Sequence, residues 1–467
     1  MNRRLLASAL ALTLAGCGGV LHRVQPDRKS PVALPDAFSR GAGGEPSIGE
    51  AWWQALGDGA LDRLCRAALE GNLDLRRAAA RIAAAEAVSK SAGAMIWPQL
   101  QLETSVSRSR QNLFLGQAVA FEVTNFPVSL AASYEVDLWG RVASTRKAAE
   151  LDARATADDL AAARISVTGA VADAWYAVVG ERATLALLDA QAEVNKQLVE
   201  LVEVSFGAGL AAAVDVLQQR GQLEAVLSQR PAAEGRLALA EQRLTMLLGG
   251  VPGGKAPELP DDAKVPEPAP LPPLGVPATL LARRPDVRAA RRRMLAVDHR
   301  VVAASAELLP AIRLSASTGF QGRSSERQDA IFFENWVWNL FSGLTAPLWD
   351  GGRRKAEVER TKALLADAVA GYGQVVQRAM TEVEEALVRD ETERRSLAAV
   401  DRRLDIARKT LEEARFRYAH GQTDYLPVLT TLAALQNLEQ ERLARLRAAL
   451  TVRVGLLRAL AGAPGDA

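Results

Sequence analysis

The chain of 467 residues has only 5% aromatic residues and is rich in Ala, Leu, Arg and Glu, which favours long helices over a compact aromatic core. Its formal net charge of +2 gives no electrostatic attraction for a nucleic-acid partner. Two cysteines far apart in sequence, Cys17 and Cys65, do not make a disulfide framework, and Cys65 is most simply a small buried apolar residue.

The amino end has the pattern of a secretory signal peptide over residues 1–16. A charged start, an apolar run over residues 5–14 and small residues before Cys17 indicate cleavage, because the run is too short to span a membrane as a mature helix. Leu-Ala-Gly-Cys at residues 14–17 resembles the bacterial lipobox, which implies lipidation of Cys17. The alternative is an ordinary cleaved signal with an incidental cysteine. Gly18 after the cysteine, by resemblance to sorted lipoproteins, favours the outer membrane.

Residues 17–57 contain several prolines among polar and glycine residues, which predicts an extended, lipid-anchored strap. A helical period begins at Asp58. It continues over residues 72–96 without a breaker until Gly93, and Pro98 closes this element.

After Pro98 the period changes to two residues, which predicts strands with one apolar and one polar face. The expected strands lie at about 99–108, 128–138, 311–320 and 338–348. Each is long enough to cross a bilayer as a tilted strand.

Aromatic residues gather around these strands. Thirteen of the 23 Phe, Trp and Tyr residues lie within 97–139 and 310–349, as aromatic girdles at lipid–water boundaries would place them. A soluble β-hairpin with an aromatic face is the alternative. Four strands cannot close a barrel, and an open sheet edge cannot exist in lipid, so transmembrane strands would require the chain to oligomerise.

Two long segments, 141–206 and 353–420, contain no proline, which predicts helices of about 100 Å each that form a rod or a tube wall. Each ends at a glycine turn, at Gly209 and Gly421, where the chain reverses.

The return segments 212–248 and 424–462 are therefore expected to form antiparallel helical hairpins with the long helices. Pro231 predicts a kink or local break in the first return segment, and the second segment has no equivalent proline.

The sequence repeats itself in one constant register. The matched pairs are Asp74 and Asp286, Pro98 and Pro310, Arg141 and Arg353, and Gly209 and Gly421, and the separation along the chain is the same in all four pairs. Residues separated by this distance are called equivalent below. The register predicts two structural repeats, 58–250 and 278–467. They are joined by a surface linker over 251–277, which holds nine of the 21 prolines.

No residue pattern indicates catalysis. His22, His299 and His420 lie on separate segments without metal-ligand spacing. The sequence has no phosphate-binding loop before a Lys-Ser or Lys-Thr and no nucleophile elbow, so neither an enzyme nor a cofactor is expected.

The lipobox, the duplication and the glycine turns together resemble the TolC-like outer-membrane efflux factors, specifically the NodT-type lipoproteins. The most specific match is the segment 417–429, Arg-Tyr-Ala-His-Gly-Gln-Thr-Asp-Tyr-Leu-Pro-Val-Leu, which is similar to the family's tip motif. Residues 138–141 and 348–353 are similar to its strand-to-helix joints. The resemblance implies a mainly helical fold with a transmembrane β-barrel portion.

The resemblance also implies a homotrimer in the bacterial outer membrane. Three chains of four strands would form a twelve-stranded barrel, and their helices would form a periplasmic tunnel. It implies a periplasmic membrane-fusion adaptor and an inner-membrane pump of the resistance–nodulation–division (RND) class. The channel itself would conduct small molecules such as drugs passively.

Function is then expected at the periplasmic tip. The family narrows its closed tip with a leucine that matches Leu426 and with an aspartate four residues later, where this chain has Thr430. Asp424 and Asp215 are the candidates to supply the missing negative charge. Arg417 or Tyr418 is expected to hold helices together through interhelical hydrogen bonds. For Leu426 ordinary helix packing remains open, as does a helix N-cap for Asp424.

Two other functions fit the same sequence. A channel for type I protein secretion, driven by an ABC transporter, would need the same architecture. A non-channel helical lipoprotein in the periplasm would not need strands with polar inner faces and an aromatic rim.

Overall fold

The computed structural model of the chain describes residues 21–28, 30–40, 48–114, 118–254, 260, 265–268, 270–271, 273–325 and 332–462. The expected signal peptide and Cys17 lie outside these residues. The chain forms two compact units. The strand unit comprises Met1–Pro31, Arg81–Ala157 and Ala289–Gly373. The helical unit comprises Val32–Ala80, Asp158–Arg288 and Gln374–Ala467. Each unit takes residues from both halves of the sequence, so the duplication does not coincide with the division into units.

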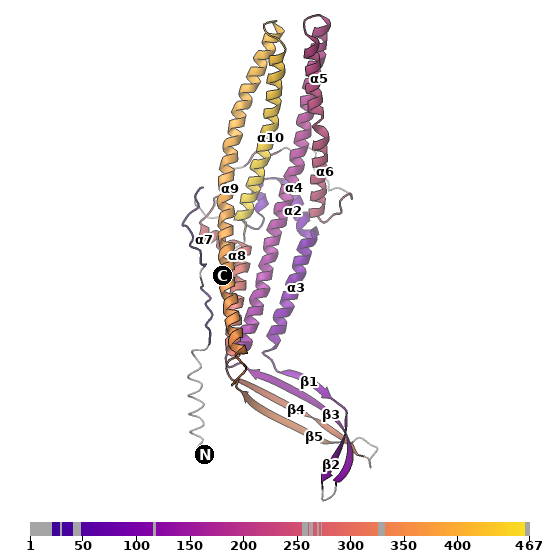
Figure 1. Ribbon diagram of the computed structural model, residues 1–467, viewed down its shortest axis with the longest axis vertical. Coiled ribbons are helices and arrows are strands. Elements are labelled where there is room, and N and C mark those ends of the chain that lie inside the picture. The colour runs from indigo at the N-terminus through magenta and orange to yellow at the C-terminus, as the bar shows by residue number, and fades with distance from the viewer. Residues whose placement is uncertain are drawn as a thin grey trace. The chain divides into compact units, whose positions relative to one another are not determined.

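The long helices are the same in both halves. Helix α4 spans Arg141–Gly207 and helix α9 spans Arg353–Ala419 (Figure 1), so each has 67 residues and the two begin at equivalent arginines. The predicted helices over 141–206 and 353–420 are confirmed to within one residue. Neither helix contains proline, which would remove a main-chain donor from the helix interior.

The shorter helices keep the same register. Helix α3 (Leu73–Ala94) corresponds to α8 (Pro285–Ala306), and both have 22 residues. Helix α2 (Gly59–Gly71) and helix α7 (Pro277–Arg283) end at equivalent positions. Within the described part of the chain, no helix combines the length and the apolar character needed to cross a membrane.

The return helices differ between the halves. In the first half, α5 (Ala213–Leu227) and α6 (Arg230–Leu247) are separate, whereas α10 (Leu426–Leu460) is continuous. Pro231 lies in the first turn of α6, where its missing N–H is tolerated. The local break predicted at Pro231 is confirmed.

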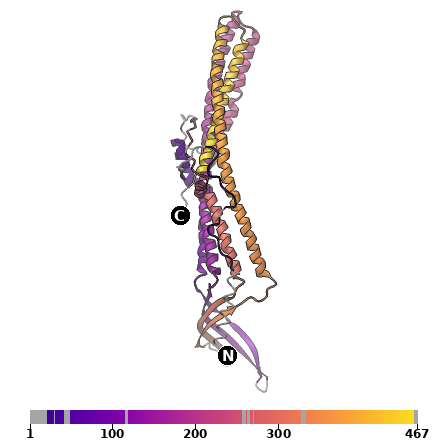
Figure 2. The same ribbon diagram turned by 90° about the vertical axis from the view of Figure 1, so that its left-hand side faces the viewer.

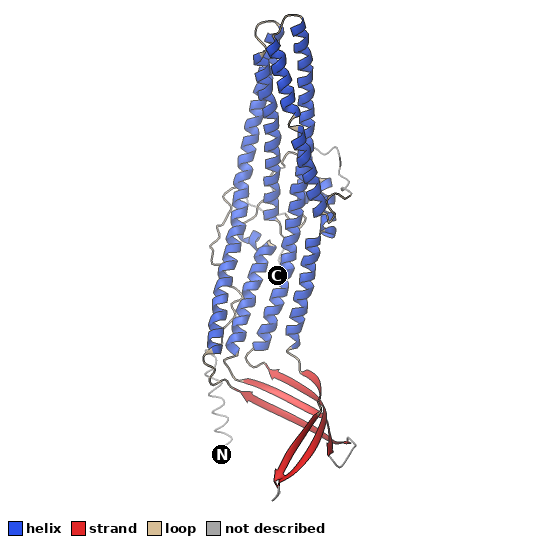
Figure 3. Ribbon diagram, turned by 45° about the vertical axis from the view of Figure 1, so that its right-hand side comes forward, coloured by secondary structure: helices blue, strands red, loops and turns tan. Residues whose placement is uncertain are grey.

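Five strands form one antiparallel sheet in the strand unit, drawn in red in Figure 3. They are β1 (Gln99–Thr104), β2 (Ser107–Phe114), β3 (Ala118–Val136), β4 (Ala311–Ser325) and β5 (Phe332–Thr345). Their order is β1-β3-β4-β5, and β2 pairs with the other end of β3. The pairing of β3 with β4 joins the two halves of the sequence in one sheet.

The strands differ from their predicted bounds near two prolines. The sequence predicts one strand over residues 99–108, but Ser105 and Val106 separate β1 from β2. They lie beside Pro127 of β3, which has no N–H to donate across the ladder. Strand β3 nevertheless continues through Pro127 and begins at Ala118 rather than at 128. Strand β5 ends at Thr345, shortly before Pro347, rather than at 348.

The two faces of the sheet differ in polarity. Directly paired residues of antiparallel strands share a face, so the register assigns each side chain to one side. One face carries large apolar side chains that are all highly exposed: Leu100, Leu102, Leu130, Phe320, Trp336, Trp338 and Leu340. The other carries the exposed apolar Val337 and Phe341 of β5 but mainly polar and small residues: Gln99, Gln101, Glu103, Ser129, Ser133, Ser315, Ser317 and Asn339. The predicted alternation is confirmed in β1, β3 and β4 and is weaker in β5.

The carboxyl end of the strap is not extended as predicted. Residues Trp52–Leu56 form a 3-10 helix, labelled η2. Trp52 is 1% exposed and donates its indole N–H to Thr168 Oγ1 at 3.0 Å, and Trp53 donates to Asp62 Oδ1 at 2.9 Å. Burial of two large rings with both N–H groups bonded explains why the backbone coils here.

Trp52 belongs to the main apolar core of the helical unit. Cys65 also lies in this core with no exposed surface, as predicted. Its burial raises the pKa of the thiol to about 12, so the sulfur stays protonated and unreactive.

Candidate functional site

Two glycine turns end the long helices within the helical unit. Gly209 has φ +76° and Gly421 has φ +67°, in the left-handed region that favours glycine. In both turns the N–H of the residue after the glycine donates to the carbonyl five residues earlier, at 2.8 Å in the first turn and 2.9 Å in the second. This cap satisfies a carbonyl that the helix end leaves free and lets α4 and α9 reverse into α5 and α10.

A small apolar core, here called the tip core, lies beside these turns. It consists of Leu198, Val202, Val216, Leu411, Ala414, Tyr425, Val428 and Leu432. These residues come from α4, α5, α9 and α10 and from the residue preceding α10, and the four helices lie side by side at this end in Figure 2. A groove of about 1900 Å³ opens next to the tip core, and its lining includes the exposed apolar residues Leu201, Leu210 and Leu426.

The predicted gate residues lie at the start of α10. Leu426 is the first residue of this helix and is 51% exposed, so packing within the single chain leaves much of its side chain uncovered. Thr430 is exposed and donates its hydroxyl to Leu426 O at 3.0 Å on its own helix. Asp424 is exposed and is not the N-cap, because that position belongs to Tyr425.

Asp215 and Arg417 have local roles. The Asp215 carboxylate accepts from the main-chain N–H of Ala212 at 2.9 Å, so it caps the start of α5. Arg417 pairs with Glu413 at 2.7 Å, four residues earlier on α9, and both side chains are exposed. Of the two residues predicted as alternatives for joining neighbouring helices, Arg417 makes an ion pair that, within the described chain, stays on its own helix.

Tyr418 reaches α10 through ring packing. Its ring meets that of Tyr425 edge to face with centroids 5.2 Å apart. Tyr425 is 1% exposed and donates its hydroxyl to Gln219 Oε1 at 2.8 Å. Burial raises the pKa of Tyr425 above its ordinary value, so the hydroxyl remains a hydrogen-bond donor. Gln219 could not be recognised from the sequence, because glutamine at helical spacing is typical of a solvated face.

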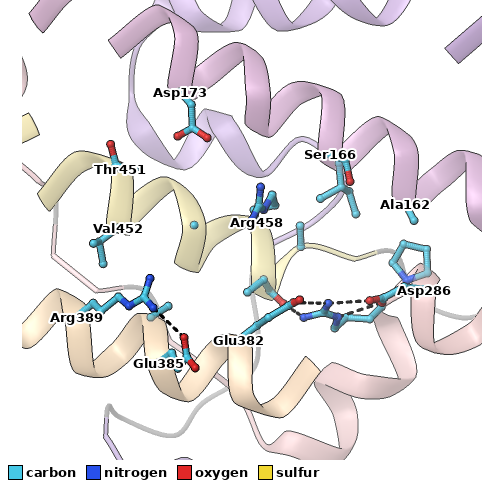
Figure 4. Close-up of a pocket in the computed structure, with 17 residues that line it drawn as sticks. Ala162, Ser166, Asp173, Asp286, Glu382, Glu385, Arg389, Thr451, Val452 and Arg458 are labelled. Carbon is cyan, nitrogen blue, oxygen red and sulfur yellow. Dashed lines mark hydrogen bonds and ion pairs between the residues drawn. The ribbon is translucent and has the colours of Figure 1, made fainter. Parts of the chain in front are cut away.

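A second cavity of the helical unit, of about 540 Å³, is lined by charged side chains (Figure 4). Arg284 bonds Asp286 and Glu382 at 2.7 Å each and donates to Ala459 O at 3.2 Å. These bonds connect the start of α8 to α9 and α10, so Arg284 acts as a structural link. Among the described residues, no His, Cys, Asp or Glu cluster is placed to hold a metal ion.

The model of the family described as Outer membrane efflux protein matches residues 64–250 and, a second time, residues 276–463. The two matches begin at equivalent positions of the repeat and cover most of the chain. The chain belongs to the outer membrane efflux protein family.

Similar proteins match this chain over nearly its full length. The chain is 31% identical over 473 residues to the pyoverdine export outer membrane protein OpmQ of Pseudomonas aeruginosa, covering 97% of this chain and 95% of that protein. It is 29% identical over 460 residues to Nodulation protein T of Rhizobium leguminosarum bv. trifolii, covering 95% of each. It superposes on the solved outer-membrane channel OprN with a TM-score of 0.86 and 26% identity, covering 95% of this chain and 99% of that one.

The resemblance to TolC-like and NodT-type proteins is thereby confirmed, as is the mainly helical fold with antiparallel strands. This member of the outer membrane efflux protein family is an efflux channel of the outer membrane and not an enzyme.

Proposed function

We propose that three copies of this efflux channel assemble so that their sheets close into one barrel of twelve strands, in which β1 and β2 of each copy count as one interrupted strand along β3. The observation that supports this is the sheet itself, with one exposed apolar face, one polar face and, in the described chain, β5 and the β1–β2 pair at its edges without a further partner strand. Unpaired main-chain groups cannot be left in lipid, and neighbouring copies would pair them. The polar face would then line the duct.

The duct would be one part of a tripartite system. A periplasmic membrane-fusion adaptor and an inner-membrane RND pump would deliver small molecules to it, and the channel would conduct them passively. The similarity to a protein named for pyoverdine export supports a small-molecule cargo. A type I secretion channel fed by an ABC transporter is the second candidate, and co-purification of an ABC transporter in place of an RND pump would favour it.

A lipid on Cys17 would tether each copy to the membrane without building the duct. The strap supports this because it is fixed soon after that cysteine. His22 bonds the buried Asp298 of α8 at 2.5 Å, and the main-chain N–H of Gln25 donates to the same carboxylate at 2.9 Å. A Cys17→Ser variant exported through another signal should therefore still form trimers, and a purely monomeric product would contradict this role.

The first turn of α10 would narrow the duct, with Leu426 as the gate. Its exposed leucine side chain beside the tip groove supports this assignment. Leu426→Ser should raise the single-channel conductance of the full-length protein in planar bilayers several-fold. Unchanged conductance would contradict a gate at Leu426. Absence of both heat-resistant trimers and any conductance would contradict the proposed trimeric channel.

A further inference from the structure

A row of buried polar side chains runs through the helical unit next to the tip core. It begins with the bond from the Tyr425 hydroxyl to Gln219 Oε1. Gln219 in turn donates to Asn195 Oδ1 at 3.0 Å and to Asn195 O at 3.2 Å. Neither Gln219 nor Asn195 has any exposed surface. The bond therefore lies wholly inside the bundle.

The row continues along α4, α5 and α10. Asn195 donates to Gln191 O at 2.7 Å, and Gln191 donates to Gln436 O at 3.1 Å and to Glu439 at 3.0 Å. Gln222 of α5 donates to Gln436 Oε1 at 3.1 Å. The row thus connects α4 and α5 of the first half to α10 of the second.

Such a row costs stability wherever a group is left unbonded, because a buried amide loses its hydrogen bonds to water, and Gln436 Nε2 is buried without a bond partner among the described residues. Leucine or valine at these positions would bury more apolar surface. Polar groups in a helical core instead favour one relative arrangement of the helices, since any slip leaves a donor or an acceptor unpaired.

We propose that Gln219 is a positioning residue for the gate. Through the Tyr425 hydroxyl it holds the first turn of α10 against the α4–α5 hairpin, and it thereby fixes the place of Leu426, the next residue. Tyr425 transmits the constraint because its carbonyl accepts from Val428 N at 3.0 Å and Leu429 N at 3.2 Å. This inference depends on the proposed gate at Leu426.

Two substitutions test the bond from its two ends. Tyr425→Phe removes the hydroxyl and keeps the ring packed against Tyr418, and Gln219→Leu removes the acceptor. Each should raise the mean conductance of the full-length channel in planar bilayers about tenfold, the equivalent of about 1.4 kcal/mol. The double variant should exceed the larger single effect only slightly, because both changes remove the same bond. Gln219→Glu keeps an acceptor for the hydroxyl and should restore part of the low conductance.

A second measurement distinguishes a local change at the start of α10 from a general loss of stability. Hydrogen exchange at the main-chain amides of residues 428–432 should speed up in Tyr425→Phe, while residues 456–460 at the other end of α10 stay protected. The control is Leu244→Ala, in the main core, which should lower the melting temperature and leave conductance unchanged.

The outcomes distinguish the two levels of the proposal. If Leu426→Ser raises conductance and Tyr425→Phe does not, the gate stands and the role of Gln219 is wrong. If Leu244→Ala opens the channel as much as Tyr425→Phe, the effect is general destabilisation and the inference also fails. If no variant conducts, the proposed channel assembly itself is contradicted.

Discussion

The two halves of the chain are most alike where a side chain bonds the main chain at the end of a return helix. In the first half Asn72 donates to Leu247 O at 2.9 Å. In the second half the equivalent residue, Arg284, donates to Ala459 O at 3.2 Å, and Ala459 is itself equivalent to Leu247. Two chemically different side chains thus make the same bond to the end of the return helix. The duplication preserves the hydrogen bond to the main chain, although the type of side chain that makes it differs.

At the tip the halves diverge. Tyr425 and Leu426 of the second half occupy the positions of Ala213 and Val214 in the first. Thr431, the counterpart of Gln219, bonds Pro427 O on its own helix at 2.7 Å. Among the described residues, a turn tied to the other hairpin through a buried tyrosine therefore occurs in the second half alone. This bond to the other hairpin therefore distinguishes the start of α10 from the start of α5.

The largest expected effect comes from introducing into the continuous helix α10 the proline that the first half has at the equivalent position. Leu443 of α10 is the counterpart of Pro231. Leu443→Pro should destabilise the protein by about 3 kcal/mol or more, because proline removes one helix hydrogen bond and clashes with the carbonyl of Glu439. Thermal unfolding followed by circular dichroism measures the loss.

Pro231→Leu is the matched substitution in the first half. Pro231 sits in the first turn of α6, so its removal should change stability by less than about 1 kcal/mol. Equal losses of stability in the two variants would contradict the dependence on the position of proline within the helix.

An intermediate effect is expected at the turn glycines. Gly209→Ala and Gly421→Ala should each cost about 1–2 kcal/mol, because an L residue with positive φ is strained. A Cβ at either position meets no atom within 4 Å, so the cost is confined to the backbone. Gly207→Ala is the control, since its helical counterpart is already Ala419. If it destabilises as much as the other two, backbone strain is not the cause.

Much of this fold could be predicted from the sequence because its signals are local. The absence of proline, together with a glycine turn at the carboxyl end, predicts the bounds of α4 and α9 to within one residue. The strands are harder to predict, because β3 passes through Pro127, and a proline inside a strand normally indicates its edge or its end. Pairing with β4 on the other side maintains the strand there.

The tip shows what local patterns cannot reveal. Gln218 and Gln219 are adjacent and identical in type, yet Gln218 is exposed and Gln219 is fully buried. Only the packing of α5 against α4 and α10 distinguishes them. The motif is enough to place Leu426 beside the glycine turn, but the bond partner of Tyr425 depends on a contact over 206 positions in sequence.

The smallest expected effect concerns a pair of acids at equivalent positions. Both line the cavity of Figure 4, where Asp173 is partly buried, whereas its counterpart Glu385 is exposed and pairs with Arg389 at 2.9 Å. Burial raises the pKa of Asp173 above its ordinary value of 3.8, and the positive charges of Arg458 and Arg243 only partly oppose this. The protonated acid is therefore the form that favours folding.

The sign of the pH dependence follows from this shift. The favourable contribution of Asp173 is fully present below about pH 3.8 and is lost as pH rises through the raised folded-state pKa. Asp173→Asn should therefore raise the melting temperature at pH 7, by less than the glycine substitutions lower it, and have little effect near pH 3. Glu385→Gln should lack this pH-dependent gain, because it removes only an exposed ion pair worth about 0–1 kcal/mol. A melting temperature that falls at pH 7 in Asp173→Asn would mean that attraction to Arg458 outweighs the cost of burial.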